Sequence, residues 1–210
     1  MLREYCAENL KGVPEALAAG AQRIELCDDL SVGGITPCDE VIARAVQVVH
    51  AAGGAVMVMV RPRGGDFAYN EAELGAMERT IGVARAAGAD GVVFGCVRNG
   101  MLDRVATARL ATAAQGMDMT FHMAFDQVDR AYQPAVLGEL VELGFSRVLT
   151  HGGALTEPVE RCLPWLHELV RAADKRIAIM PGGGITWHNA EQICTELGVT
   201  QVHGTKIVRL

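Results

Sequence analysis

The chain has 210 residues, of which 50% are hydrophobic and 21% are charged, and its formal net charge is −6. This composition predicts a globular fold, because enough apolar surface can be buried to offset the conformational entropy of the chain. The negative charge argues against nucleic-acid binding, which needs a basic face, and no apolar run reaches the roughly 18 residues of a membrane span. The amino-terminal residues show no secretory signal and the six cysteines lack CxxC spacing. We therefore expect a cytoplasmic protein with reduced thiols.

Short aliphatic strands alternate with helical segments along the chain. Strands are predicted near 2–6, 24–26, 55–60, 92–94, 119–122, 147–149, 177–180 and 201–202, and helices near 13–19, 38–52, 71–87, 103–115, 132–143, 157–173 and 187–197. Such alternation implies parallel strands joined by right-handed crossovers. Eight units predict a single domain over 1–210, an α/β fold of the (β/α)₈ TIM-barrel type. The rival, an open doubly wound sheet, would need a GxGxxG motif after an early strand, and none is present.

The eighth strand lies close to the end of the sequence at Leu210. The eighth helix of the barrel is therefore expected to be short or missing.

Side chains alternate faces along a strand, so the apolar side of each strand fixes which residues point into the barrel. In the second strand, Ile24 and Leu26 suit the helix-facing side. The inward residues then include five ionisable groups and two pairs of sulfur-containing residues: Glu4, Cys6, Glu25, Cys27, Met57, Met59, Arg61, His122 and His203. Buried charge is costly unless it is paired or serves a site. The cluster indicates either a working pocket or a structural Glu–Arg network.

Cys6 and Cys27 end neighbouring strands with the same parity. Because neighbouring strands lie ~4.8 Å apart, the two sulfur atoms could reach one metal ion. Soft thiolates favour Cu(I), with zinc as the alternative, whereas two small core hydrophobes are the simpler interpretation of a buried pair. Met57 and Met59 are expected to fill the barrel rather than to form a thioether relay.

Two loops are candidates for binding an anion. Arg61 and Arg63 lie in the RPRGGDF segment after the third strand, where two guanidinium groups suit a carboxylate or phosphate, or an Arg–Asp pair holds the loop. Gly182, Gly183 and Gly184 follow the seventh strand, and His203 to Lys206 follow the eighth. Many barrels bind phosphate at these two loops. Glu25 and His122 are the candidate general acid or base.

Several segments resemble the CutC family, which is named for copper homeostasis. The similar segments run nearly end to end, at 23–27, 33–37, 60–67, 88–95, 120–122, 124–126, 144–150, 179–185 and 202–204. The resemblance implies a cytosolic TIM barrel, often oligomeric, with a Cu(I) role for Cys6 and Cys27. The chain departs from the family pattern at Met123, where Arg is usual, at His151, where Ser is usual, and in its short carboxyl-terminal region.

Three functions are therefore expected, in order of preference. The first is a cytosolic copper homeostasis protein that binds Cu(I) through Cys6 and Cys27 at the mouth of the barrel. The second is an enzyme acting on a small anionic metabolite, with Glu25 or His122 as acid or base. The third is a non-catalytic barrel that acts through a homo-oligomer, with no nucleic acid or membrane as partner.

Overall fold

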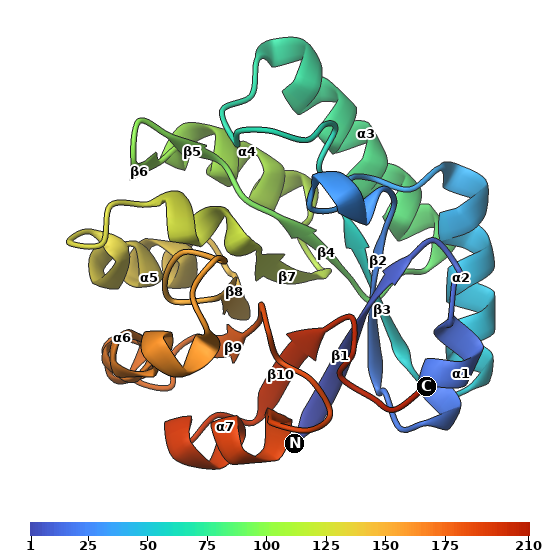
Figure 1. The fold of residues 1–210 in the computed structure, drawn as a ribbon. Helices are drawn as coiled ribbons and strands as arrows, with labels where there is room; N and C mark the ends of the chain where they lie inside the picture. Colours follow the sequence, from blue (N-terminus) through green and yellow to red (C-terminus); the bar gives the residue numbers. More distant parts are fainter.

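The computed structural model describes residues 1–210, and its central element is an eight-stranded parallel sheet rolled into a nearly closed barrel (Figure 1). Neighbouring strands follow the order β10-β1-β2-β3-β4-β7-β8-β9. Their bounds are β1 (Leu2–Glu8), β2 (Arg23–Cys27), β3 (Ala55–Met59), β4 (Gly91–Phe94), β7 (Asp118–Phe121), β8 (Arg147–Thr150), β9 (Ala178–Pro181) and β10 (Gln201–Gly204). The predicted (β/α)₈ barrel is confirmed.

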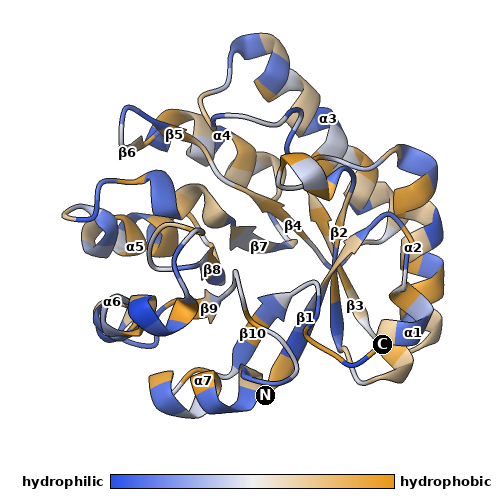
Figure 2. Cartoon of the chain, in the orientation of Figure 1, coloured by the Kyte–Doolittle hydropathy of each residue, from blue (hydrophilic) through white to orange (hydrophobic).

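Seven helices cover the outside of the barrel (Figure 1). They are α1 (Val13–Ala18), α2 (Asp39–Ala51), α3 (Glu71–Ala87), α4 (Arg104–Ala113), α5 (Gln133–Glu142), α6 (Val159–Ala173) and α7 (Ala190–Leu197). In α2 the buried residues are Ile42, Ala45, Val46 and Val49, which is the spacing of one helix face. Each helix thus buries one apolar stripe against the strands and leaves its polar side to solvent, as the colours of Figure 2 indicate.

The predicted parity of β2 and β3 is confirmed by two separate buried clusters. Ile24, Leu26, Val56 and Val58 belong to the large apolar core. Inside the barrel lies a second, smaller cluster of Cys6, Cys27, Met57, Met59 and Val93. The barrel interior is therefore set apart from the layer under the helices, and it holds the groups that matter chemically.

Residues 205–210 stand in place of an eighth helix, as expected. Ile207 and Val208 are buried, and the backbone N–H of Trp187 donates to the carbonyl of Lys206 at 2.8 Å. The chain end then reaches the beginning of α1, where a Cβ built on Gly12 would lie 3.3 Å from Leu210 (Figure 1). This short segment thus runs from β10 to α1, beside β1 (Figure 1).

Some local elements escaped the sequence analysis. A small antiparallel hairpin pairs β5 (Val97–Arg98) with β6 (Met101–Leu102), and two 3₁₀ helices occur at η1 (Leu30–Val32) and η2 (Met123–Gln127). The helix expected from residue 187 begins only at Ala190, after a turn whose backbone bonds to the loop of β10. No helix in the fold combines the length and apolar character that crossing a membrane requires.

Candidate functional site

Four ionisable side chains meet near the carboxyl end of the barrel interior, and we call Cys6, Glu25, Cys27 and His203 the thiol cluster. Oε2 of Glu25 lies 3.4 Å from Sγ of Cys6, 3.5 Å from Sγ of Cys27 and 3.6 Å from Nε2 of His203. The register that pairs Cys6 with Glu25 brings β1 and β2 together here. All four residues are buried, so their polar atoms interact mainly with one another.

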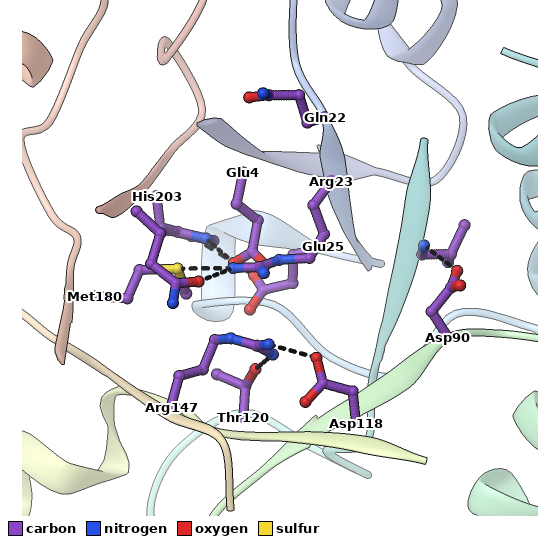
Figure 3. Close-up of polar contacts among 12 residues, drawn as sticks. Glu4, Gln22, Arg23, Glu25, Asp90, Asp118, Thr120, Arg147, Met180 and His203 are labelled. Carbon is purple, nitrogen blue, oxygen red and sulfur yellow. Dashed lines mark hydrogen bonds and ion pairs between the residues drawn. The ribbon is translucent and has the colours of Figure 1, made fainter. Parts of the chain in front are cut away.

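A second set of polar side chains lies one inward position earlier along β1 and β2, beneath the thiol cluster. Figure 3 shows its members Glu4 and Arg23 together with His203. Glu4 accepts a hydrogen bond from Nδ1 of His203 at 2.8 Å and forms an ion pair with Arg23. Nη2 of Arg23 donates to Oε1 of Gln201 at 2.7 Å and lies 3.2 Å from Sδ of Met180. Because Gln201 lies on β10 and Met180 on β9, Arg23 connects the first and last strands of the sheet order from inside the barrel.

The charges of this layer stabilise one another. Burial alone would raise the pKa of Glu4, but the hydrogen bond from His203 and the charge of Arg23 hold that pKa at about 2. Burial alone would lower the pKa of His203, whereas the charge of Glu25 and hydrogen bonds to Cys6 and Glu4 raise it well above its usual value. Glu4 is therefore an anion that orients and charges His203.

The pKa values of the two thiols are shifted in opposite directions. Hydrogen bonding from Cys27 lowers the pKa of Cys6 well below its usual value, against the effect of burial. The same contact with Cys6, together with burial, raises the pKa of Cys27. Burial also raises the pKa of Glu25 well above its usual value. Hydrogen bonding therefore shifts the pKa values of the two thiols in opposite directions, and burial opposes ionisation of the Glu25 carboxyl.

Arg61 lies past the end of β3 and fastens two loops over the thiol cluster. Its Nη1 donates to the carbonyls of Val32 and Gly34 at 2.9 and 3.0 Å, and its Nη2 donates to the carbonyl of Gly65 at 2.9 Å. Gly34 is pressed against the thiol, because a Cβ built there would lie 3.1 Å from Sγ of Cys27. Most donors of Arg61 are thus used by the chain itself, and Nε is the buried atom without a partner.

His122 is buried but does not contact the thiol cluster. The predicted strand 119–122 ends at Phe121, and His122 caps η2 by accepting a hydrogen bond at Nδ1 from the N–H of Ala124. Its ring lies 4.9 Å from that of Phe67. Burial and the charge of Arg61 lower the pKa of His122 to about 3. A neutral imidazole results, with Nε2 buried and without a hydrogen-bond partner.

Arg63 is engaged by its own loop. Its Nε pairs with Glu73 at 2.5 Å and its Nη1 with Asp66 at 2.9 Å. Further donors reach the carbonyls of Gly64, Asp66 and Ala68. This geometry corresponds to the alternative in which an Arg–Asp pair holds the loop.

The glycine loop after β9 and the loop after β10 lie together, as expected. Thr186 and Lys206 form a β-bridge, and a Cβ on Gly204 would lie 2.5 Å from the carbonyl oxygen of Ile185. Gly183 and Gly184 have φ values of 74° and 79°, a conformation that glycine adopts without strain. The N–H of Gly182 donates to the carbonyl of Thr150, whereas those of Gly183 and Gly184 donate to no backbone carbonyl of the chain.

Two of the three departures from the family pattern, Met123 and His151, lie beside this loop. Nδ1 of His151 lies 3.2 and 3.1 Å from the carbonyl oxygens of Gly182 and Gly183, and Nε2 lies 3.1 Å from that of Glu157. Met123 packs near Gly182, where a Cβ would lie 3.0 Å from Cε. His151 therefore braces the loop through its carbonyls, and Met123 contributes an apolar wall.

The sequence analysis missed several buried polar residues of the barrel interior. Arg23 has the parity of Glu25, Gln201 has that of His203, and Arg147 points inward to Thr120 and Asp118 (Figure 3). Strand alternation was the signal that could have found Arg23 and Gln201. Their partners depend on the register between the first and last strands, which no local pattern reveals.

Fold and site together define a TIM-type barrel with thiols, carboxylates and imidazole buried at its mouth. The chain belongs to the CutC family, whose family model matches residues 1–208. The resemblance seen in the sequence is therefore confirmed.

The similar proteins agree with this assignment. A CutC family protein of Enterococcus faecalis is 44% identical over 99% of this chain and 100% of its own length. A human protein named copper homeostasis protein cutC homolog is 40% identical over 96% of this chain and 72% of its own length. The crystal structure of a copper homeostasis protein CutC from Streptococcus agalactiae superposes with a TM-score of 0.96, at 44% identity over 99% of this chain and 100% of that chain.

A deoxyribose-phosphate aldolase from Coccidioides immitis has a TM-score of 0.70 at 12% identity, covering 98% of this chain and 81% of its own. At this level of identity the likeness extends to the fold alone. The family and its link to copper homeostasis thus come from the CutC relatives, and the barrel fold is shared more widely.

Proposed function

We propose that this protein is a cytosolic copper homeostasis protein that binds Cu(I) through Cys6 and Cys27. The observation that carries the proposal is that both sulfur atoms lie within 3.5 Å of the same carboxylate oxygen, in a buried site. Thiolates are the soft ligands that Cu(I) prefers. The names of the CutC relatives, which refer to copper homeostasis, support the same metal.

The surrounding groups suit a monovalent cation. When a metal ion binds, a thiol ligand loses its proton, so the Cys27 proton would be released as Cu(I) enters. Glu25 and His203 lie next to the sulfur atoms and would orient them, while Arg23 and Glu4 keep the layer beneath electrically balanced.

An anaerobic titration with a competing chromogenic Cu(I) chelator tests this proposal. The wild type should bind one equivalent of Cu(I), and the Cys6→Ser/Cys27→Ser variant should lose it. The matched control is Cys162→Ser/Cys194→Ser, which removes two other buried thiols, on α6 and α7. Equal stoichiometry and affinity in the wild type and the Cys6/Cys27 variant would remove the assignment, as would loss in the control alone.

Acid–base chemistry on a small anion is the second candidate, with Glu25 or His122 as the acid or base. Oε1 of Glu25 and Nε2 of His122 are buried without partners, and the N–H groups of Gly183 and Gly184 could hold an anion near His203, which lies beside Gly182. Inorganic phosphate should then raise the melting temperature of the wild type and not that of Lys206→Met. If phosphate does not raise the melting temperature of the wild type, this second candidate function is contradicted.

A further inference from the structure

We propose that the thioether of Met59 is a third sulfur ligand beside Cys6 and Cys27, so that the thiol cluster forms a Cys₂Met site. This inference rests on the Cu(I) function proposed above and names the ligand set of that same site. Neither the family assignment nor the two-thiol proposal includes this residue, and the proposal departs from the expectation that Met59 only fills the barrel. Its consequence is selectivity, because a thioether is a soft, neutral donor that favours Cu(I) over Zn(II).

Strand register places Met59 beside Cys27. Glu25 pairs with Met57 and Leu26 pairs with Val58, so the next positions along the two strands are Cys27 and Met59. Paired residues on adjacent parallel strands point to the same side of the sheet, about 4.8 Å apart. Met59 is accordingly buried in one packed cluster with Cys6 and Cys27, at 4% exposure.

The two methionines of β3 differ in what surrounds their sulfur atoms. The side chain of Met57 extends over Gly91 of β4, where a Cβ would lie 2.7 Å from Sδ of Met57. Met57 therefore fills the space that the glycine leaves, one layer deeper in the barrel. Met59 lies one layer nearer the mouth, level with Cys27, and it has no such glycine to cover.

The other donors near the two thiols are an imidazole engaged with two carboxylates and the carboxyl of Glu25, whose Oε1 has no partner but is a hard oxygen donor that Cu(I) favours less than a thioether. Nδ1 of His203 is bonded to Glu4, and its Nε2 faces Oε2 of Glu25 at 3.6 Å. The thioether of Met59 forms no hydrogen bond, so its lone pairs are available to a cation. A neutral third donor also adds no further negative charge to a buried site that contains two thiolates once the metal has bound.

The test compares Met59→Leu with Met57→Leu. Both changes replace a buried thioether with a side chain of similar volume on the same strand, so both should cost little in packing. Met59→Leu should weaken Cu(I) binding about tenfold or more and leave Zn(II) binding unchanged, whereas Met57→Leu should leave both unchanged. Copper K-edge X-ray absorption should count three sulfur ligands in the wild type and Met57→Leu, and two in Met59→Leu.

Failure of this inference can be told apart from failure of the proposed function. If Cu(I) binding disappears in Cys6→Ser/Cys27→Ser but Met59→Leu binds like the wild type, the Met59 assignment is overturned and the two-thiol function stands. If both methionine variants lose affinity equally, packing explains the loss and the assignment also fails. If the wild type binds no Cu(I), both proposals fail together.

Discussion

His122 shows how one buried side chain can make the stability of this barrel depend on pH. Its pKa is about 3 in the folded protein against an ordinary value of 6.5. Between these values the unfolded chain binds a proton at His122 that the folded chain excludes. The free energy of unfolding should therefore fall as pH decreases from 6.5 to 3, by about 1.4 kcal/mol per pH unit from this residue.

Urea unfolding at several pH values between 6.5 and 4 measures this slope in the wild type and in His122→Asn. Asparagine retains an acceptor for the N–H of Ala124 and does not titrate, so its curve should be shallower. Contributions from Glu4 and other acids are common to both proteins and cancel in the difference. His188→Asn, at an exposed position, is the control. Parallel curves for His122→Asn and the wild type would refute the buried neutral imidazole.

Residue identity alone predicts only part of this chemistry. Thr120 and His122 have the same parity, and that pattern predicted an inward His122. The pattern could not predict that β7 ends at Phe121 and that the imidazole caps η2, because such capping depends on the local backbone. Arg61 is similar: its inward position was predictable, but the carbonyls of Val32, Gly34 and Gly65 that occupy its donors come from loops without periodicity.

The packing of β4 against β3 and β7 depends on Gly91 having no side chain. A Cβ at this position would clash with the carbonyl oxygen of Asp118 and with the thioether of Met57. Gly91→Ala should therefore destabilise the protein by about 1–3 kcal/mol, since overpacking forces the neighbouring strand or Met57 to move. Chemical denaturation of the wild type and variant measures the difference in the free energy of unfolding.

Gly82→Ala provides the matched control for that change. Gly82 lies within α3, and a Cβ built there meets no atom within 4 Å. Alanine at this helix position should stabilise the protein by about 0.5–1 kcal/mol, because glycine loses more backbone freedom on folding. If both glycine variants change stability in the same direction, the close approach at Gly91 is not what makes that glycine necessary.

Strands and helices were the most predictable elements, because their periods are short and regular. The apolar alternation of β3 fixed which residues line the interior, and the spacing in α2 fixed its buried face. The β5–β6 hairpin and the two 3₁₀ helices lie in connections where a few turn residues decide the path. For the same reason the start of α7 was placed three residues too early.

The barrel as a unit depends on residues 205–210, which cover it where an eighth helix would otherwise lie. Ile207 is fully buried in this segment, whereas Leu210 is 63% exposed. Ile207→Ala should lower the free energy of unfolding by about 2–5 kcal/mol, because it leaves a cavity in the large apolar core. Leu210→Ala should change it by less than about 0.5 kcal/mol.

Thermal or urea unfolding of the two variants measures this contrast. If both variants lower the free energy of unfolding by the same small amount, residues 205–210 do not contribute to the stability of the barrel. The sequence predicted the missing helix but not this substitute. Its contacts join residues at opposite ends of the chain, such as Gly12 and Leu210, and no local pattern contains that information.

The hydrogen bond from Arg61 to the carbonyl of Gly34 controls the access of solvent to the buried sulfur atom of Cys27. Cys27 is 1% exposed and Gly34 lies directly against its sulfur atom. Thiol-specific reagents reach Cys27 only when the loop after β2 opens. The exposed Cys38 reacts with them directly. Labelling kinetics at Cys27 would accordingly report the frequency of that opening rather than the intrinsic nucleophilicity of the thiol.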